Sequence, residues 1–317
     1  MNNSTTLPAN TTSTASSVSV VLRICVVTPL FGIFLCFIIL MLYTMASHRQ
    51  FWDNSRYILF AYMLINDTLQ LLFTVLLFLF TMTGVRMAFV FCGPLLFISS
   101  ATYQNTPFIL ATMSLERYIA ICYPLRHQEI CRVDRTWVVI LALWLTSCII
   151  PTINFALVGY YSIDVYSTPV TCVTKLLNSS HIQTLFKVTV NALFLALVAT
   201  VILSTYIRIL LKAKRMRSDK APVNKALHTV ILHGVQLLLC MMSYTYPVTE
   251  GLIVVQVGWL REHISFFNYF CFILLPRFLS PLIYGLRDEN LRVHMKGSIR
   301  CCSTKINPNA SGNKFIK

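Results

Sequence analysis

Seven long apolar stretches limit the fold of this chain more than any other feature. A hydrocarbon core about 30 Å thick is crossed by around 20 mostly apolar helical residues. The stretches lie at about 21–45, 57–82, 91–122, 136–160, 184–211, 226–257 and 264–286. Each is too long and too continuously apolar to be a barrel strand, so helices must satisfy the backbone inside a bilayer. The 317 residues are 56% hydrophobic and only 12% charged, about half the charge of a soluble domain. We therefore predict an all-α membrane protein, a bundle of seven transmembrane helices.

The basic residues predict how this bundle is oriented. The chain carries 26 Lys and Arg against 11 Asp and Glu, a formal net charge of +15. If the N-terminus lies outside, the cytoplasmic segments are about 46–56, 116–135, 208–225 and 287–317, and they hold 20 of the 26 basic residues. Cytoplasmic loops are enriched in Lys and Arg. We expect a multi-pass plasma-membrane protein with an extracellular N-terminus and a cytoplasmic C-terminus.

The two ends of the chain have different compositions. We expect an extracellular tail over 1–20, the seven-helix domain over 21–286, and a cytoplasmic amphipathic helix and tail over 287–317. Residues 1–17 are rich in Ser, Thr and Asn, with no Lys or Arg and no apolar core. They do not resemble a cleavable signal peptide, so the first span should direct insertion. Glycosylation acceptor triplets on the expected outer side begin at Asn2, Asn3, Asn10 and Asn178.

The 11 cysteines do not form the framework of a small disulfide-rich protein. Those inside spans act as small apolar residues. Cys92 opens the third span on the outer side and Cys172 lies in the long loop after the fourth span, so they are candidates for one bridge in an oxidising compartment. Cys301 and Cys302 follow a basic amphipathic stretch beyond the last span, where we expect palmitoylation; the alternative is a pair of unmodified thiols.

The segment MSLERYIAICYPLRH, Met113–His127, closes the third span. It resembles the Asp/Glu-Arg-Tyr signature of rhodopsin-like (class A) G-protein-coupled receptors and, more narrowly, the odorant-receptor form MAYDRYVAICxPLxY. Further family-like features follow in the family's order from the second span to the end. They are Asp67 in LINDTLQLL, Cys92 at 25 residues before Arg117, Trp144 in the fourth span, Tyr206 in LSTYIRIL, KALHTVILH opening the sixth span, and SPLIYGLRDENLR at the seventh span and following helix. The resemblance implies a seven-helix bundle followed by a short amphipathic eighth helix.

The chain also departs from the odorant-receptor pattern. The first span lacks the Gly-Asn of the family, and the next loop reads NSRYILF instead of TPMYFFL. Ser280 replaces the Asn of the seventh-span motif, and the loop before the fifth span offers one cysteine where most odorant receptors have three. These departures indicate a divergent branch, of the fish odorant-receptor type, and leave another sensory or orphan receptor open.

Ionisable residues inside a bilayer point to function. In the receptor interpretation, Glu116 holds Arg117 at rest, and outward movement of the sixth helix frees Arg117 to support a G protein. Tyr118 completes this motif, and the hydroxyls of Tyr206 and Tyr284 would reach into the opened cavity. Such an arrangement is a two-state element. The alternative is that Arg117 only anchors the helix end at the membrane surface.

Asp67 and Arg277 are the charged residues expected at mid-depth. Related receptors hold sodium at the position that Asp67 occupies. Arg277 lies one turn before Pro281 in the seventh span, so its depth should be similar. A hydrogen-bonded pair is far less costly than either charge alone. We expect Arg277 to take the electrostatic role of sodium and to lock the second helix to the seventh; a wet cavity around Arg277 is the alternative.

Helical phase predicts the ligand site. Steps of three and four residues outward from Arg117 reach Tyr103 and Ser99, at about 21 and 27 Å. The predicted ligand contacts, all in the outer half of the bundle, are Ser99, Ser100, Tyr103, Gln104, Asn191 and Tyr244. The third span has no Asp or Glu in its outer half, which favours a neutral or weakly polar ligand. Hydrogen bonds between helices are the alternative role for these side chains.

Other chemistries find little support in the sequence. Metal-binding and catalytic motifs such as HExxH and CxxC are absent, and no nucleophile has a recognisable base. The basic run at 212–217 follows a span and indicates contact with anionic lipid and a G protein, not nucleic acid. We predict an odorant receptor without cofactor or metal, which binds a small extracellular ligand and activates a heterotrimeric G protein of the stimulatory, olfactory type. The alternatives are a non-olfactory class A receptor for a small hydrophobic or peptide ligand, an ion channel or transporter, and an intramembrane enzyme.

Overall fold

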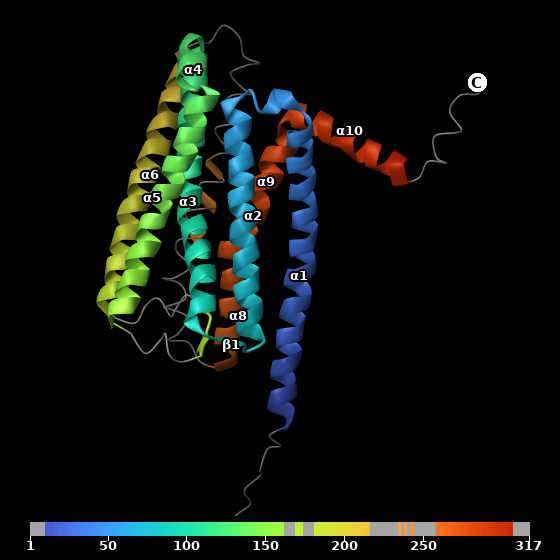
Figure 1. The fold of residues 1–317 in the computed structure, drawn as a ribbon, viewed down its shortest axis with the longest axis vertical. Helices are drawn as coiled ribbons and strands as arrows, with labels where there is room; N and C mark the ends of the chain where they lie inside the picture. The colour runs from blue at the N-terminus through green and yellow to red at the C-terminus, as the bar shows by residue number, and fades with distance from the viewer. Residues whose placement is uncertain are drawn as a thin grey trace, which may run out of the picture.

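Long helices make up almost all of the described structure (Figure 1). The computed structural model describes residues 10–161, 169–173, 181–215, 234–235, 238–239, 242–243 and 258–306. The long helices in the first two thirds of the chain are α1 (Asn10–Ser47), α2 (Ser55–Met82), α3 (Phe89–Cys122), α5 (Val133–Tyr161) and α6 (His181–Arg215). The short 3-10 helix Arg49–Phe51 links α1 to α2, and α4 (Pro124–Ile130) links α3 to α5. These helices cover the first five predicted spans, and α1 begins already within the expected N-terminal tail.

The last predicted span is a column of three helical pieces. It consists of α8 (Gly258–Tyr269), a π-helical turn (Phe270–Leu274) and α9 (Leu275–Arg287). The helix α10 (Glu289–Ile306) follows and points away from the bundle beside the end of α1 (Figure 1). Most of the sixth predicted span, 226–257, lies outside the described residues, but its six described residues are helical.

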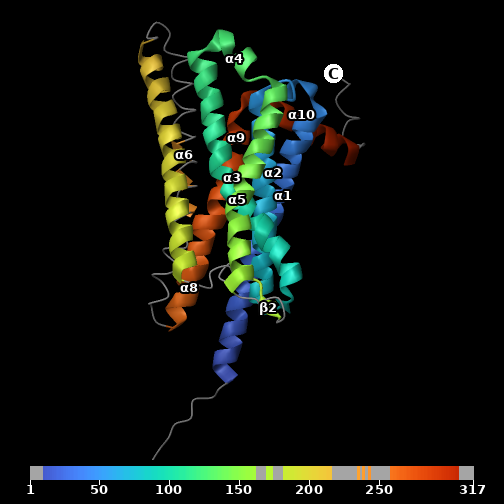
Figure 2. The ribbon, with the colours of Figure 1, turned by 60° about the vertical axis from the view of Figure 1, so that its left-hand side comes forward.

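Four described helices are long and apolar enough to cross a membrane. These segments are Ser19–Ser47, Ser55–Met82, Val133–Tyr160 and Val188–Lys212. The central helix α3 is equally long but more polar, because it packs against α2, α5 and α6 and buries polar side chains among them. The turned view in Figure 2 shows α3 between α6 and α2.

Polarity is distributed as a bilayer requires. Large apolar side chains on the outer face of α5, such as Val138, Leu141 and Leu145, are exposed. Polar side chains of α2 and α3, such as Asn66, are buried instead. In hydrocarbon a polar group needs a partner inside the protein, whereas an apolar side chain can face lipid. The chain is therefore a multi-pass membrane protein whose centre is polar.

A small two-stranded sheet lies at the end of the bundle where α2 ends and α3 begins. Gly84, with φ at +68°, makes the left-handed turn after α2 that glycine tolerates best. Strand β1 (Arg86–Met87) then pairs antiparallel with β2 (Val170–Thr171), with Arg86 opposite Thr171 and Met87 opposite Val170. This pairing positions Cys172 beside the start of α3.

Candidate functional site

An ion pair lies fully buried in the middle of the bundle. Arg277 Nη1 on α9 is 2.6 Å from Asp67 Oδ1 on α2, and the two side chains are 4% and 0% exposed. Thr106 on α3 joins them: its hydroxyl donates to Asp67 Oδ1 at 3.3 Å and accepts a hydrogen bond from Arg277 Nη1. The helical rise had predicted a similar depth for the two charges, and the packing brings them into direct contact. The pair ties three helices together where neither charge could be tolerated alone.

Amide and hydroxyl side chains extend this centre between α2 and α3. Asn66 Nδ2 donates to Thr106 Oγ1 at 3.0 Å and to the Thr102 carbonyl at 3.1 Å. Asn105 Nδ2 donates to Asn66 Oδ1 at 3.0 Å and to the Tyr62 hydroxyl. This network was not predicted from the sequence, although Asn66 beside Asp67 and Asn105 beside Thr106 were a usable signal.

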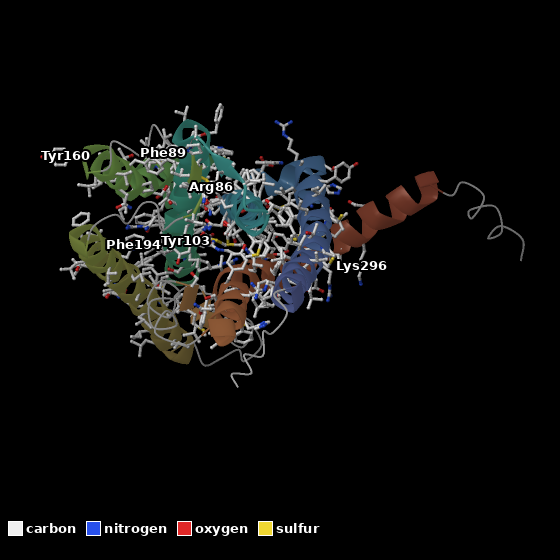
Figure 3. All side chains as sticks on the ribbon, turned by 90° about the horizontal axis from the view of Figure 1, so that it is seen from below. Arg86, Phe89, Tyr103, Tyr160, Phe194 and Lys296 are labelled. Atoms are coloured by element: carbon white, nitrogen blue, oxygen red, sulfur yellow. A yellow bond between two sulfur atoms is a disulfide. The ribbon has the colours of Figure 1, made fainter. Side chains whose placement is uncertain are left out.

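The predicted ligand residues lie at the next level outward, and some bind one another. Gln104 Nε2 donates to Asn191 Oδ1 on α6 at 3.0 Å. The Tyr103 hydroxyl donates to the Ser243 carbonyl at 2.8 Å, and Figure 3 shows Tyr103 among the crowded side chains inside the bundle. Ser99 is buried and Ser100 is half-buried. Interhelical hydrogen bonds, the alternative role, therefore engage Tyr103, Gln104 and Asn191 in this structure.

One predicted ligand residue, Tyr244, lies outside the described residues.

The N-terminal end of α3 is anchored covalently, because a disulfide joins Cys92 to Cys172, and both residues are buried. The bond holds the segment that contains β2 against the start of α3.

The charged motif at the C-terminal end of α3 is looser than the buried centre. Arg117 Nε is 3.7 Å from Glu116 Oε2, and these side chains are 15% and 7% exposed. His127 Nε2, from α4, lies 3.0 Å from the other oxygen, Glu116 Oε1. His127 stands where the odorant-receptor motif has Tyr. This difference was a signal by which the partner of Glu116 could have been predicted. Burial, followed by the Glu116 charge, raises the pKa of the nearby Cys131 thiol, which therefore stays protonated at neutral pH.

The other predicted switch residues surround this end of the bundle. Arg208 Nη1 on α6 donates to the Tyr118 hydroxyl at 3.4 Å, and Tyr206 is buried. The backbone of Tyr284 belongs to α9, but its side chain lies outside the described part. The structure thus brings α3, α4 and α6 together around the Glu116–Arg117 motif.

A second charged cluster at the same end of the bundle fixes the start of α10. Arg56 Nη2 is 2.9 Å from Asp288 Oδ2, and the Tyr57 hydroxyl donates to Asp288 Oδ1 at 3.3 Å. Asp288 Oδ1 also accepts the Leu291 N–H at 3.1 Å, which caps the helix. Arg56, Tyr57 and Asp288 line a small cavity that Arg117 also reaches. This link between the start of α2 and the start of α10 was not predicted from the sequence.

The predicted modification sites lie at or beyond the ends of the described segments. Asn2, Asn3 and Asn178 lie outside the described residues, and Asn10 is the first residue of α1. Cys301 and Cys302 lie in α10, but their side chains are not among those that the structure describes. Among the described residues, no group of three or more His, Cys, Asp and Glu side chains is arranged to hold a metal ion.

Known proteins are similar to this sequence over most of its length. Residues 38–284 match the family described as 7 transmembrane receptor (rhodopsin family). The chain is 32% identical to odorant receptor 131-2 of Danio rerio over 260 residues, which cover 79% of this chain and 77% of the relative. It is 26% identical to human olfactory receptor 10H5 over 237 residues, which cover 71% of each chain.

Proposed function

The chain belongs to the rhodopsin family of seven-transmembrane receptors, and from that membership we propose that it is an odorant receptor acting through a G protein. The observation that carries this proposal is the similarity to a fish odorant receptor over 79% of the chain. The human relative is also named as an olfactory receptor. The family is one of receptors and not of enzymes.

We propose the full architecture of that family for this chain. Seven spans would cross the membrane within 21–286, with α10 as an amphipathic eighth helix on the cytoplasmic side. The concentration of 20 of the 26 basic residues in segments on one side supports an extracellular N-terminus. Asn2, Asn3, Asn10 and Asn178 would then be accessible to glycosylation, and Cys301 and Cys302 to palmitoylation near the lipid surface.

We propose that a small neutral or weakly polar molecule binds in the outer half of the bundle. Its contacts would come from Ser99, Ser100, Tyr103, Gln104, Asn191 and Tyr244. The Gln104–Asn191 bond supports this idea, because a ligand that replaces it would change how α3 is held to α6. A ligand can shift a conformational equilibrium only through such differences in contact between the two states.

The signal would reach the cytoplasm through Glu116, Arg117 and Tyr118, with Tyr206 and Tyr284 at the opened cavity. The split attachment of Glu116 to Arg117 and His127 supports a motif that can exchange partners. The partner would be a heterotrimeric G protein of the stimulatory, olfactory type, with anionic lipid beside the basic segments.

We further propose that Arg277 performs the electrostatic role that sodium has in related receptors. Its 2.6 Å contact with Asp67 supports this, because a guanidinium already neutralises the carboxylate. Exchange of sodium for potassium at equal ionic strength should leave basal signalling and thermal stability unchanged. A strong sodium-specific change in either quantity would contradict the proposal.

Arg117→Ala tests the receptor function. In cells that carry a cyclic-AMP reporter and a stimulatory olfactory-type G protein, the variant should lose about 10-fold or more of the basal and odorant-panel response. Its surface level should stay near that of the unchanged protein, because Arg117 lies at a partly exposed helix end. Arg132→Ala is the matched control, since Arg132 is on the same side and its side chain is 61% exposed. An odorant-gated current without any G protein would refute the proposal.

A further inference from the structure

The side chain of Gln104 on α3 makes only part of the hydrogen bonds that an amide can make. Its Nε2 donates to Asn191 Oδ1 on α6 at 3.0 Å. Its other polar atom, Oε1, is buried and accepts no hydrogen bond from the described part of the chain. The whole residue is only 5% exposed, so water does not replace the missing donor freely. An acceptor that is withdrawn from water without a donor costs free energy, and most buried polar groups in proteins avoid this state.

A second buried glutamine, Gln70 on α2, provides a comparison. Gln70 is 3% exposed, and its Oε1 accepts a hydrogen bond from the Thr102 hydroxyl at 3.0 Å. Its Nε2 lies 3.5 Å from Thr74 Oγ1, to which it donates. The oxygen of Gln70 is therefore satisfied inside the protein, whereas that of Gln104 has no such donor among the described residues.

Aromatic rings lie one helical turn further along the same two helices. Phe108 follows Gln104 by four residues on α3, and so lies on the same helix face. Phe194 follows Asn191 by three residues on α6, with the same consequence. The two rings are in T-shaped contact, with their centroids 4.5 Å apart. A polar amide pair thus adjoins an apolar aromatic pair between α3 and α6, a combination typical of small-molecule sites.

The surrounding stretches of both helices carry no charge. Residues 89–115 of α3 and 188–207 of α6 contain no Asp, Glu, Lys, Arg or His. The buried charges Asp67 and Arg277 already neutralise each other. An ammonium or carboxylate group would have to leave water here without a counter-ion, which is costly. The donor that suits Gln104 Oε1 is therefore an uncharged one.

We propose that the ligand is an uncharged alcohol or phenol whose hydroxyl donates a hydrogen bond to Gln104 Oε1. The inference rests on the proposed receptor function and names the chemical class of its ligand. The apolar body of the ligand lies against Phe108 and Phe194. An ether or aldehyde of the same size brings an acceptor oxygen towards Oε1 and leaves Oε1 without a donor, so it binds more weakly.

Matched probes with one carbon skeleton test this class. One set consists of 1-octanol, octanal and methyl octyl ether, and another of benzyl alcohol, benzaldehyde and benzyl methyl ether. The alcohols should raise the unfolding temperature of the purified protein at about 10-fold lower concentration than the matching aldehydes and ethers. The proposal is overturned if no alcohol stabilises the protein, or if the aldehydes and ethers act at the same concentration as the alcohols.

Gln104→Met keeps the length of the side chain and removes Oε1. The variant should lose the preference for the alcohol over the ether. Gln70→Met is the matched control: it should keep the preference but lower the unfolding temperature without ligand, because Thr102 loses its acceptor. Gln104→Met should lower that temperature less, since it also removes an unsatisfied acceptor. A purely structural role of Gln104 would lower the unfolding temperature as in the control and leave the alcohol preference intact, and this outcome would overturn the proposal.

The cyclic-AMP reporter, applied with the same probes, keeps the two possible failures apart, because the unfolding measurement does not require a G protein. If the alcohols stabilise the protein through Gln104 but Arg117→Ala leaves the cyclic-AMP response unchanged, the receptor function fails and the ligand class stands. If Arg117→Ala abolishes a response that ethers and alcohols elicit equally, only the ligand class fails.

Discussion

Arg277 and Arg117 each lie beside an acidic residue of the bundle, but they are held in contrasting ways. Arg277 is 2.6 Å from Asp67, and both side chains are almost completely buried between three helices. Arg117 is 3.7 Å from Glu116 in a partly exposed position, and His127 shares the same carboxylate. Both acidic side chains are buried, but Asp67 pairs with an arginine that is buried as well, whereas Glu116 is shared by the partly exposed Arg117 and His127. This contrast is what the proposed permanent lock at Arg277 and the proposed switch at Arg117 would require.

The largest effect should come from breaking the lock on one side only. Arg277→Met leaves the Asp67 carboxylate buried without its cation, which should cost about 3–5 kcal/mol of stability. Thermal unfolding in detergent and surface level measure the loss. Asp67→Asn should act similarly from the other side.

The double variant Asp67→Asn with Arg277→Met sharpens this test. Removal of both charges leaves no unpaired buried ion, so the double variant should be more stable than either single one. Purely additive losses would show that the two charges do not interact and would contradict a lock.

The next effect concerns the carboxylate of the switch. Glu116→Gln removes the charge that holds Arg117 and His127 together. A charge-assisted hydrogen bond contributes roughly 1.5–3 kcal/mol, and the partial exposure of this cluster reduces that to about 1 kcal/mol. Basal cyclic AMP should therefore rise about 5-fold while thermal stability changes little. A stability loss as large as that of Arg277→Met would remove the distinction between lock and switch.

A smaller effect should follow from the histidine partner. His127→Phe keeps a ring but loses the hydrogen bond to Glu116, so basal cyclic AMP should rise about 2-fold to 3-fold. His127→Gln retains an N–H donor and serves as the conservative control. Equal signalling by the two variants would show that the 3.0 Å contact has no part in the switch.

The smallest effect is expected at Arg56, whose side chain is 39% exposed in its pair with Asp288. Solvent screens such a pair, and Arg56→Met should change stability by less than about 1 kcal/mol. Basal signalling should remain unchanged, because Tyr57 and the Leu291 N–H still bind Asp288. Circular dichroism during heating and the cyclic-AMP reporter check both statements.

Hydrophobic length and charge distribution sufficed to predict the helical membrane fold. A helix in lipid satisfies its own backbone, so its existence and depth depend on local sequence. The constant rise per residue is why the similar depth of Asp67 and Arg277 could be predicted as well. The same reasoning positioned Tyr103 and Gln104 in the outer half of the third span, without identifying their partners.

Contacts between helices depend on how the bundle packs, and only the tertiary structure decided them. Helical phase could not reveal that Tyr103 meets Ser243 and Arg277, that Gln104 binds Asn191, or that Asp288 joins Arg56. Each of these contacts links segments that are distant in the sequence, and the relative rotation of packed helices determines it. The seven apolar stretches therefore determined what kind of molecule this chain forms, while helix packing decided which polar side chains pair in the buried centre and which pair at the C-terminal end of α3.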